Sequence, residues 1–153
     1  MSNYNEVLLG FEWLYSVLSG DATLTSLAPG GVWRSMAPPS SLMPYVIMAL
    51  QAGSDVTTMN GFRIMDDLLM QIKVVGPASN TATIASAAAQ IDRLLGGPPL
   101  QPASGTIAAG PTTIAQVYAC YRQTPLVIDE LINGELFLNV GGLYRMEIQQ
   151  IAS

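Results

Sequence analysis

Residues 62–75 alternate between apolar and polar side chains over a length that suits one long, half-buried β-strand. Successive side chains of a strand point to opposite faces, so one parity of this segment should face a core. The apolar parity is interrupted by Asp66 and otherwise holds Phe62, Ile64, Leu68, Met70, Ile72 and Val74. The Asn60-Gly61 pair before it is typical of a type I′ turn and predicts a hairpin over residues 55–75. We expect the even-numbered residues to face the helices.

Further strands are predicted on both sides of this hairpin. Upstream, Val32–Met36 is a short candidate, and Tyr45–Gln51 is typical of a strand buried on both faces. Downstream, a second type I′ turn is predicted at Asn133-Gly134 and a bend at Gly141-Gly142. The strands around them are expected at residues 114–122, 127–132, 135–140 and 143–151.

Two main helices are predicted. Residues 4–19 carry apolar side chains at helical spacing, and Asn3 with Glu6 resembles a capping box. Residues 80–95 carry a narrow apolar stripe, and Asp21 can cap a short helical turn between the two. Because the hairpin turns make most strands antiparallel, the class is α+β: a mostly antiparallel sheet with two main helices packed on one face.

Residues 96–113 hold Gly, Pro, Ser, Thr and Ala with few large side chains, which predicts a long loop. The chain of 153 residues suits a single domain, residues 1–153, because too little chain flanks the loop to form two cores. A long loop inside a compact domain is often functional. We expect this loop to be either a protruding arm that contacts a partner or a connection that makes no contact of its own.

Charged residues are sparse, at 11% of the chain, while 50% of the residues are apolar. Average globular domains hold about 25% charged residues, so we infer that other subunits or partners cover part of the apolar surface. The net charge is −5, and the basic residues are scattered singly. No basic patch for binding nucleic acid is therefore expected. The charge distribution stays compatible with an acidic lumen through which DNA merely passes.

No enzyme chemistry emerges from the residue types. The chain has no His and one Cys, Cys120, which excludes a zinc site of the usual ligands and the Ser-His-Asp and Cys-His arrangements. Asp66 and Asp67 should point to opposite faces of their strand, so a bulge or an intersubunit salt bridge explains them better than a shared substrate. We expect no enzyme, cofactor or metal and, without a run of about eighteen apolar residues, no membrane span.

The candidate contact residues are charged side chains and residues of the predicted loop. The set expected at contacts with other subunits or partners is Arg34, Arg63, Asp66, Asp67, Pro98, Pro99, Gln101 and Arg122. Tyr118, Tyr121 and Tyr144 could form an aromatic platform, but without interleaved basic residues core or interface packing is favoured.

Four motifs in a fixed order resemble the tail-completion or tail-terminator proteins of long-tailed bacteriophages. The leading helix is followed by a D-x-x-L-x-x-L turn, here Asp21, Leu24 and Leu27, and by a V-(Y/W) strand, here Val32-Trp33. A Pro-rich link then enters (L/M)-P-Y-(V/I)-(V/I), here Met43, Pro44, Tyr45, Val46 and Ile47. The helix of type A-x-x-(I/L)-x-x-(L/A)-L follows, here Ala88, Ile91, Leu94 and Leu95. The resemblance covers residues 7–95, with a weaker match at 143–149.

The resemblance implies a ring, usually a hexamer, at the head-proximal end of the tail tube. Such a ring stops tube polymerisation and joins the tail to the head, so its partners are copies of itself, the tail tube protein and a neck or connector protein. It implies no catalysis and no cofactor, and a place in the virion after assembly in the host cytoplasm. DNA is expected to pass through the lumen without specific binding.

Two alternatives stay open. The chain could be another phage neck component, such as a head–tail adaptor, because such proteins share small α+β cores. A cellular small-ligand-binding domain is the other alternative, and it would need a concave pocket with convergent polar groups.

Overall fold

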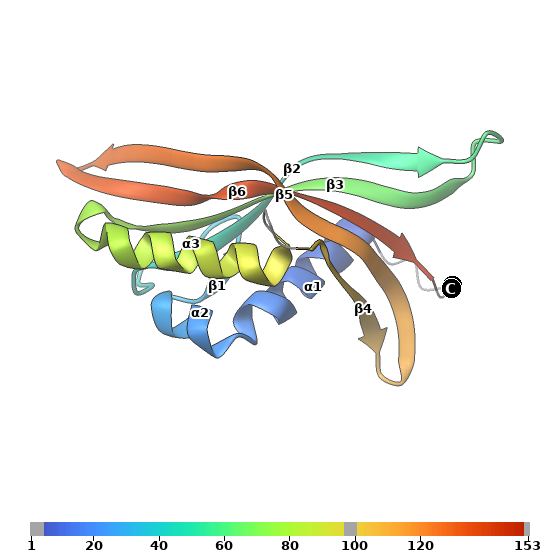
Figure 1. The fold of residues 1–153 in the computed structure, drawn as a ribbon, viewed down its shortest axis with the longest axis horizontal. Helices are drawn as coiled ribbons and strands as arrows, with labels where there is room; N and C mark the ends of the chain where they lie inside the picture. Colours follow the sequence, from blue (N-terminus) through green and yellow to red (C-terminus); the bar gives the residue numbers. More distant parts are fainter. Residues whose placement is uncertain (1–4, 97–100, 152–153) are drawn as a thin grey trace.

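The computed structural model describes residues 5–96 and 101–151. This part of the chain forms a six-stranded mixed sheet in the order β1-β2-β3-β6-β5-β4, accompanied by three α-helices (Figure 1). The class is therefore α+β. The strands are β1 (Val32–Arg34), β2 (Tyr45–Thr57), β3 (Arg63–Pro77), β4 (Ala103–Ala109), β5 (Thr112–Ile132) and β6 (Glu135–Gln150). The helices are α1 (Glu6–Ser19), α2 (Ala22–Leu27) and α3 (Thr81–Leu95), with a short 3-10 turn, η1 (Ala78–Asn80), before α3.

The predicted parity of the long strand is confirmed from Asp66 to Val74, whereas Ile64 is exposed and Phe62 lies before β3 begins. On β3 the residues Leu68, Met70, Ile72 and Val74 are all buried, and they pack in one core with Leu14 of α1 and with Ile84 and Ile91 of α3. We call this side of the sheet the core face. The odd-numbered residues from Met65 to Lys73 are half-buried on the opposite side, the open face, and include Asp67, Leu69 and Gln71.

β2 and β3 form the predicted hairpin, but its turn is not type I′. Gly61 has a φ of 81°, whereas Asn60 does not adopt a positive φ. The N–H of Gly61 donates to the carbonyl of Thr58 at 2.9 Å, and the N–H of Thr58 donates to the carbonyl of Phe62 at 2.8 Å. This is the three-residue loop in which a type I turn is followed by a glycine in the left-handed region. The second turn is type I′ as predicted, because Asn133 and Gly134 have φ of 51° and 79°.

β5 is one strand of 21 residues, so the prediction of separate strands at 114–122 and 127–132 is wrong. Register shifts between Val117 and Ala119 and between Arg122 and Thr124 absorb extra residues. Pro125 is tolerated because β4 pairs with β5 only as far as Cys120, which leaves Pro125 on an edge where its missing N–H costs no ladder bond.

β6 is also continuous, and Gly141-Gly142 does not end a strand as predicted. A Cβ atom on Gly141 would overlap the carbonyl oxygen of Ile72 on β3. The glycine is therefore required for the close approach of two strand backbones.

Part of the predicted loop at 96–113 is strand, namely residues 103–109 and 112–113, while residues 97–100 lie outside the described structure. β4 pairs with β5 from Ala103 opposite Cys120 to Ala109 opposite Thr112. A Cβ atom on Gly105 would meet the indole of Trp13 on α1, and Ile107 is buried. The prediction fails because small side chains here let a strand pack closely against a helix.

Two helices begin at side-chain caps, and α3 ends at a glycine. Asn5, not Asn3, caps α1: its Oδ1 accepts hydrogen bonds from the N–H groups of Val7 and Leu8 at 3.0 and 3.2 Å. Asn3 lies outside the described residues. Asp21 caps α2 as predicted, accepting from the N–H of Leu24 at 2.7 Å, and α3 ends at Gly96 with a φ of 73°.

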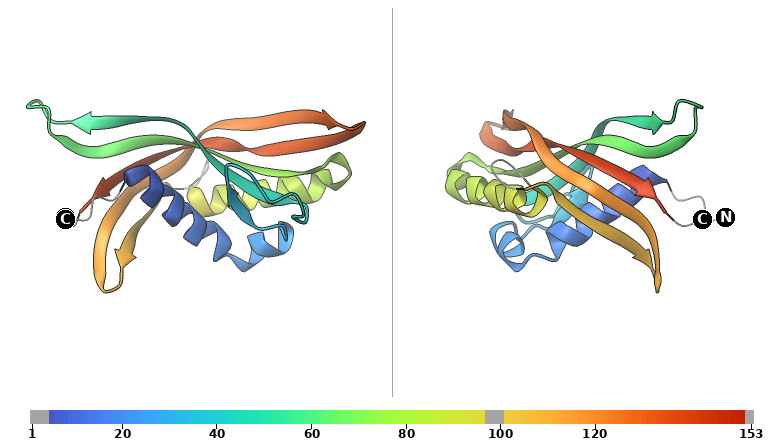
Figure 2. Two further views of the ribbon diagram at one scale, coloured as in Figure 1. Left: turned by 180° about the vertical axis from the view of Figure 1, so that it is seen from behind. Right: turned by 45° about the vertical axis from the view of Figure 1, so that its right-hand side comes forward.

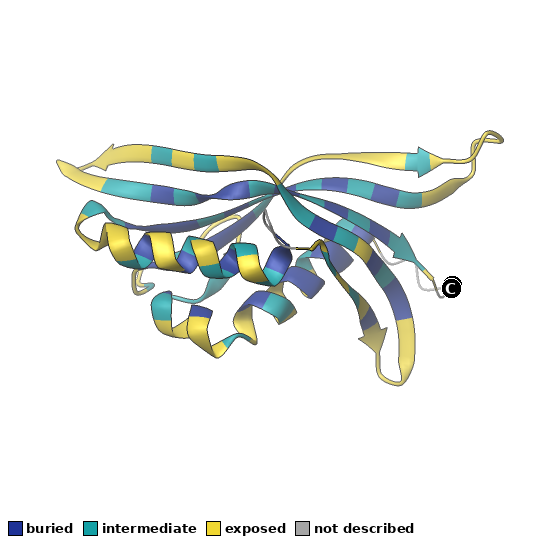
Figure 3. Ribbon diagram, viewed as in Figure 1, coloured by how far each residue is buried: buried dark blue, intermediate teal, exposed yellow. Residues whose placement is uncertain are grey.

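The long strands lie side by side in the twisted sheet near the middle of the molecule and diverge toward its ends. The β2–β3 hairpin and the β5–β6 hairpin extend toward opposite ends of the longest axis (Figures 1 and 2). The β4–β5 hairpin projects separately on the side of the β2–β3 hairpin. The middles of the strands are buried, whereas the hairpin ends are exposed (Figure 3). The fold therefore holds two long projections on a compact centre.

Candidate assembly surfaces

Two of the predicted contact residues lie close together at the start of β3. Arg63 donates from Nη2 to Oε1 of Glu6 on α1 at 2.9 Å, and Asp66 lies opposite Asp55 in the β2–β3 register. The side chain of Asp66 is buried on the core face, and its Oδ1 forms no hydrogen bond with any described residue. This cluster therefore combines three carboxyl groups with one guanidinium.

The cluster favours a proton on Asp66. Burial raises the pKa of Asp66 from 3.8 to about 6, and a hydrogen bond with Asp55 and the charge of Glu6 act in the same direction. Arg63 lowers this pKa by a smaller amount. Over residues 5–96 and 101–151, no group of three or more His, Cys, Asp or Glu side chains is arranged to hold a metal ion.

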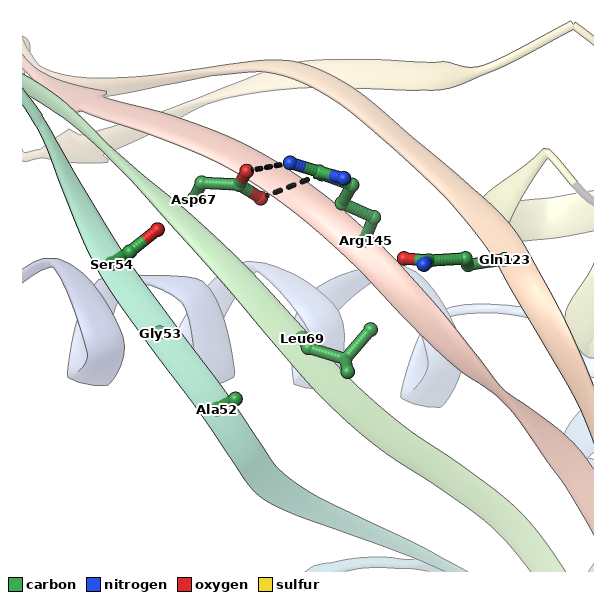
Figure 4. Close-up of a pocket in the computed structure, with 7 residues that line it drawn as sticks. All are labelled: Ala52, Gly53, Ser54, Asp67, Leu69, Gln123 and Arg145. Carbon is green, nitrogen blue, oxygen red and sulfur yellow. Dashed lines mark hydrogen bonds and ion pairs between the residues drawn. The ribbon is translucent and has the colours of Figure 1, made fainter.

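Asp67 lies on the open face, away from Asp66. Arg145 of β6 donates to it twice, from Nε to Oδ1 at 2.9 Å and from Nη2 to Oδ2 (Figure 4). This bidentate pair raises the pKa of Arg145 above its ordinary value. The ion pair of Asp67 thus lies within the chain.

The Asp67–Arg145 pair borders a shallow hollow of about 260 Å³ on the open face. Its other lining residues come from β2, β3 and β5 and are Ala52, Gly53, Ser54, Leu69 and Gln123 (Figure 4). Because Asp67 already neutralises Arg145, the hollow offers little attraction to an anion.

Arg122 takes part in an internal contact. Its Nη1 donates to Oδ2 of Asp92 on α3 at 2.5 Å, and the hydroxyl of Tyr144 on β6 donates to Oδ1 of the same carboxylate. Burial raises the pKa of Tyr144 well above its ordinary value. The arrangement ties α3 to β5 and β6. Sequence reasoning missed Asp92 because its partners are 30 and 52 residues away.

Arg34 lies at the end of β1 and is available to a partner. Its guanidinium lies 5.5 Å from the ring centroid of Phe11, a cation–π distance. No described carboxylate forms an ion pair with it. It lines an open groove of about 620 Å³ between α1 and β1, which we call the α1–β1 groove. The other lining residues are Leu8, Phe11, Glu12, Tyr15, Gly31, Val32, Trp33 and Met48.

Large apolar side chains are exposed at both long hairpins. On the β2–β3 hairpin, Met59 and Phe62 are 105% and 70% exposed, and on the β5–β6 hairpin Val127 and Leu131 are 68% and 73% exposed. Such clusters are uncommon on monomeric proteins and mark interaction sites. In the sequence, these side chains belong to the apolar parity of half-buried strands. That parity does not reveal at which residue the layer that covers the strand ends.

The remaining predicted contact residues are not gathered into one site. Gln101 is exposed just before β4, and Pro98 and Pro99 lie outside the described residues. Arg34, Asp67 and Arg122 lie on three different strands. The structure therefore distributes the candidates over several surfaces.

The comparisons with known proteins give a family and a shared fold. A family model described as "Tail completion protein gp17" matches residues 12–120. A chain in the solved structure "Virion of native gene transfer agent (GTA) particle" shares the fold, with a TM-score of 0.57 and 18% sequence identity over 89% of this chain and 91% of that chain. No curated protein sequence matches. Within the described residues, no helix has both the length and the apolar character required to cross a membrane.

Proposed function

The chain belongs to the tail completion protein gp17 family, and from this premise we propose that it forms a ring at the head-proximal end of a phage tail tube. It is a structural protein of the virion, located in the tail or neck. The ring, which we expect to be a hexamer, would end tube polymerisation and join the tail to the neck connector. We propose that this role involves neither catalysis nor a cofactor.

One observation supports a ring above all others. Exposed apolar side chains occur on two different hairpins at opposite ends of the molecule (Figure 1). A contact between two different surfaces of identical subunits is heterologous, and its repetition closes into a ring when the rotation permits. Two different apolar surfaces at opposite ends of the subunit therefore favour a ring over a two-fold dimer.

We also propose that α1 and α3 cover the core face as one layer and that the open face lines the lumen. The open face carries Arg145 neutralised by Asp67, and the net charge of the chain is −5. Sequence-independent DNA binding depends on cations that neutralise phosphates. A wall on which Arg145 is already neutralised would bind phosphates through little more than Lys73 of β3 and would let DNA pass without being retained.

Electron microscopy of the purified protein, alone and mixed with tail tubes, tests the proposal. We expect rings at one end of each tube, tubes that no longer lengthen, and a subunit number read directly from end views. Rings that bind a purified connector but never tubes would instead identify a head–tail adaptor. Particles that stay monomeric with both partners would contradict the ring and favour a small-ligand-binding domain.

A further inference from the structure

Two strands present long unpaired edges. β1 pairs with β2 only at Val46–Met48, so no described residue pairs with the outer edge of β2 from Ala49 to Thr57. β4 pairs with β5 only as far as Cys120, and within residues 5–96 and 101–151 nothing pairs with the outer edge of β5 from Tyr121 to Ile132. Open edges of this length are templates for pairing with another chain, and proteins normally cover or interrupt them.

The strand order makes these two edges complementary. From one open edge to the other the order is β2, β3, β6 and β5, and each neighbouring pair is antiparallel. β5 therefore runs opposite to β2. When copies are related by rotation about a ring axis, β5 of one copy can lie antiparallel beside β2 of the next, with the core faces of both copies on the same side.

We infer that the open edge of β5 adds antiparallel to the open edge of β2 in the next copy, joining the sheets of neighbouring subunits. This inference deepens the proposed ring and rests on it. β1 occupies part of the β2 edge and β4 occupies part of the β5 edge, so these two strands limit which residues of the open edges can pair. Pairing of Thr124 opposite Ser54 brings Ile128 of one copy opposite Ala49 of the next, because the extra residue Gln51 adds one position to β2, and Asp129 then follows where β1 ends.

The side chains support this register. Asp129 lies opposite Leu138, and Leu138 packs against the core, so the side chain of Asp129 is on the core face. Leu131, two residues further along β5 and opposite Leu136, is on the same face. Arg34 lies opposite the buried Met48, which places it on the core face as well. The pairing therefore brings an acidic side chain beside an arginine that has no ion pair among the described residues.

The apolar side chains fit the same arrangement. The α1–β1 groove holds the exposed side chains of Leu8 and Tyr15 beside Arg34. Leu131 of the neighbouring copy would reach this groove from the core face of its own hairpin. One contact would then cover two open edges, an unpaired arginine and apolar surface on both partners.

Cysteine pairing tests the strand contact directly. Ser54 of β2 and Thr124 of β5 are both exposed on the open face, and the register places them opposite each other in neighbouring copies. Within one chain they lie three strand spacings apart across the sheet, about 14 Å, and also at different levels along the strands, which is too far for a disulfide. The double variant Ser54→Cys/Thr124→Cys, assembled on tail tubes and oxidised, should give a ladder of covalent oligomers on a non-reducing gel.

Two matched pairs make this result specific. Ser54→Cys with Leu126→Cys tests the register two residues away, and a ladder there would also support edge pairing. Ser54→Cys with Ala108→Cys places the second cysteine on the opposite edge strand β4 and should give monomers only. Rings on tubes without a ladder from either β5 pair would overturn the inference and leave the ring intact. Absence of rings with the unmodified protein would overturn both.

Charge reversal tests the register independently. Arg34→Glu and Asp129→Lys should each weaken every contact by about fivefold, seen as fewer capped tubes at a given protein concentration. The double variant should restore capping. Arg93→Glu, on the exposed side of α3, is the control and should cap tubes normally. Additive losses in the double variant would refute the pairing of these two residues.

Discussion

At the scale of single residues, Asp66 is a buried carboxyl group whose surroundings favour its neutral form. It lies opposite Asp55 and close enough to Glu6 and Arg63 for their charges to act on it. Only one of these neighbours is a cation. Neutral Asp66 can donate a hydrogen bond to Asp55, whereas the charged form must remain buried with an oxygen that lacks a partner in the described structure.

This burial makes stability depend on pH. The pKa of Asp66 is about 6 in the folded state and 3.8 ordinarily, so the folded state binds more protons between these values. The stabilisation is therefore present below about pH 4 and is lost as the pH rises through 6. We predict that Asp66→Asn raises the free energy of unfolding at pH 8 by on the order of 1–3 kcal/mol.

Urea unfolding at pH 5 and pH 8 measures this effect. The unmodified protein should lose more stability between the two pH values than Asp66→Asn does. Asp129→Asn, at an exposed position, is the control and should leave the pH dependence unchanged. Equal pH dependence in the unmodified protein and in Asp66→Asn would contradict the assignment.

Asp67 prevents Arg145 from acting as a free cation on the open face. We predict that Asp67→Asn gives the assembled ring a measurable affinity for double-stranded DNA. The affinity should fall about threefold per freed arginine between roughly 50 and 200 mM salt. Fluorescence anisotropy with labelled DNA measures it, and Asp67→Asn/Arg145→Gln should abolish it. DNA binding that persists in the double variant would show that another surface is responsible.

At the scale of secondary structure, Gly141 controls how closely β6 approaches β3. Any Cβ atom there would overlap the carbonyl oxygen of Ile72, which belongs to the backbone and cannot rotate away. We predict that Gly141→Val abolishes soluble, folded protein, because the β3–β6 ladder cannot form around it. Circular dichroism of the purified variant tests this. Gln51→Val, on an exposed part of β2, should stay folded, and a folded Gly141→Val would refute the packing argument.

The two Asn-Gly turns show what local sequence can and cannot predict. Both dipeptides predict hairpins and both hairpins form. One turn is a two-residue type I′ loop, while the other is a three-residue loop in which only Gly61 has a positive φ. The difference depends on which residues pair last, and that register is set by the core rather than by the dipeptide.

The same limit explains the errors at β4 and β6. Small residues are typical of loops, and paired glycines are typical of bends. In both strands the small residues instead meet a distant partner, Trp13 for Gly105 and Ile72 for Gly141. Such contacts join segments far apart in the chain, so no local pattern reveals them. Parity along β3 was predictable because it depends only on neighbouring residues.

At the scale of the whole molecule, candidate assembly surfaces occur where the long strands extend beyond the part of the sheet that is buried. Sparse charge correctly predicted uncovered apolar surface, but the residues involved could not be ranked. Arg122, which was expected at a contact, also binds Asp92 within the chain. Leu131 was assigned to an ordinary strand and proves to be largely exposed. Burial depends on the lengths of several elements together.

Shortening the β5–β6 hairpin separates folding from assembly. Deleting Glu130 and Leu131 together with their partners Phe137 and Leu136 removes two register pairs and preserves the parity of the strands. We predict that the monomer keeps its helices and strands and loses at least tenfold in tube capping, because about 1.4 kcal/mol per contact suffices for that loss. Circular dichroism and counts of capped tubes measure the two effects. Normal capping would exclude this hairpin from the contact.

The β3–β6 ladder also determines how the subunit responds to mechanical force. It holds twelve register pairs, from Asp66 opposite Ile148 to Pro77 opposite Phe137, and it joins two hairpins that point in opposite directions (Figure 1). Tension applied to both hairpin tips would pull the two strands past each other. All the hydrogen bonds of the ladder would then share the load at once, instead of opening one after another from an end. A subunit connected in this way resists stretching along its long axis better than its small core suggests.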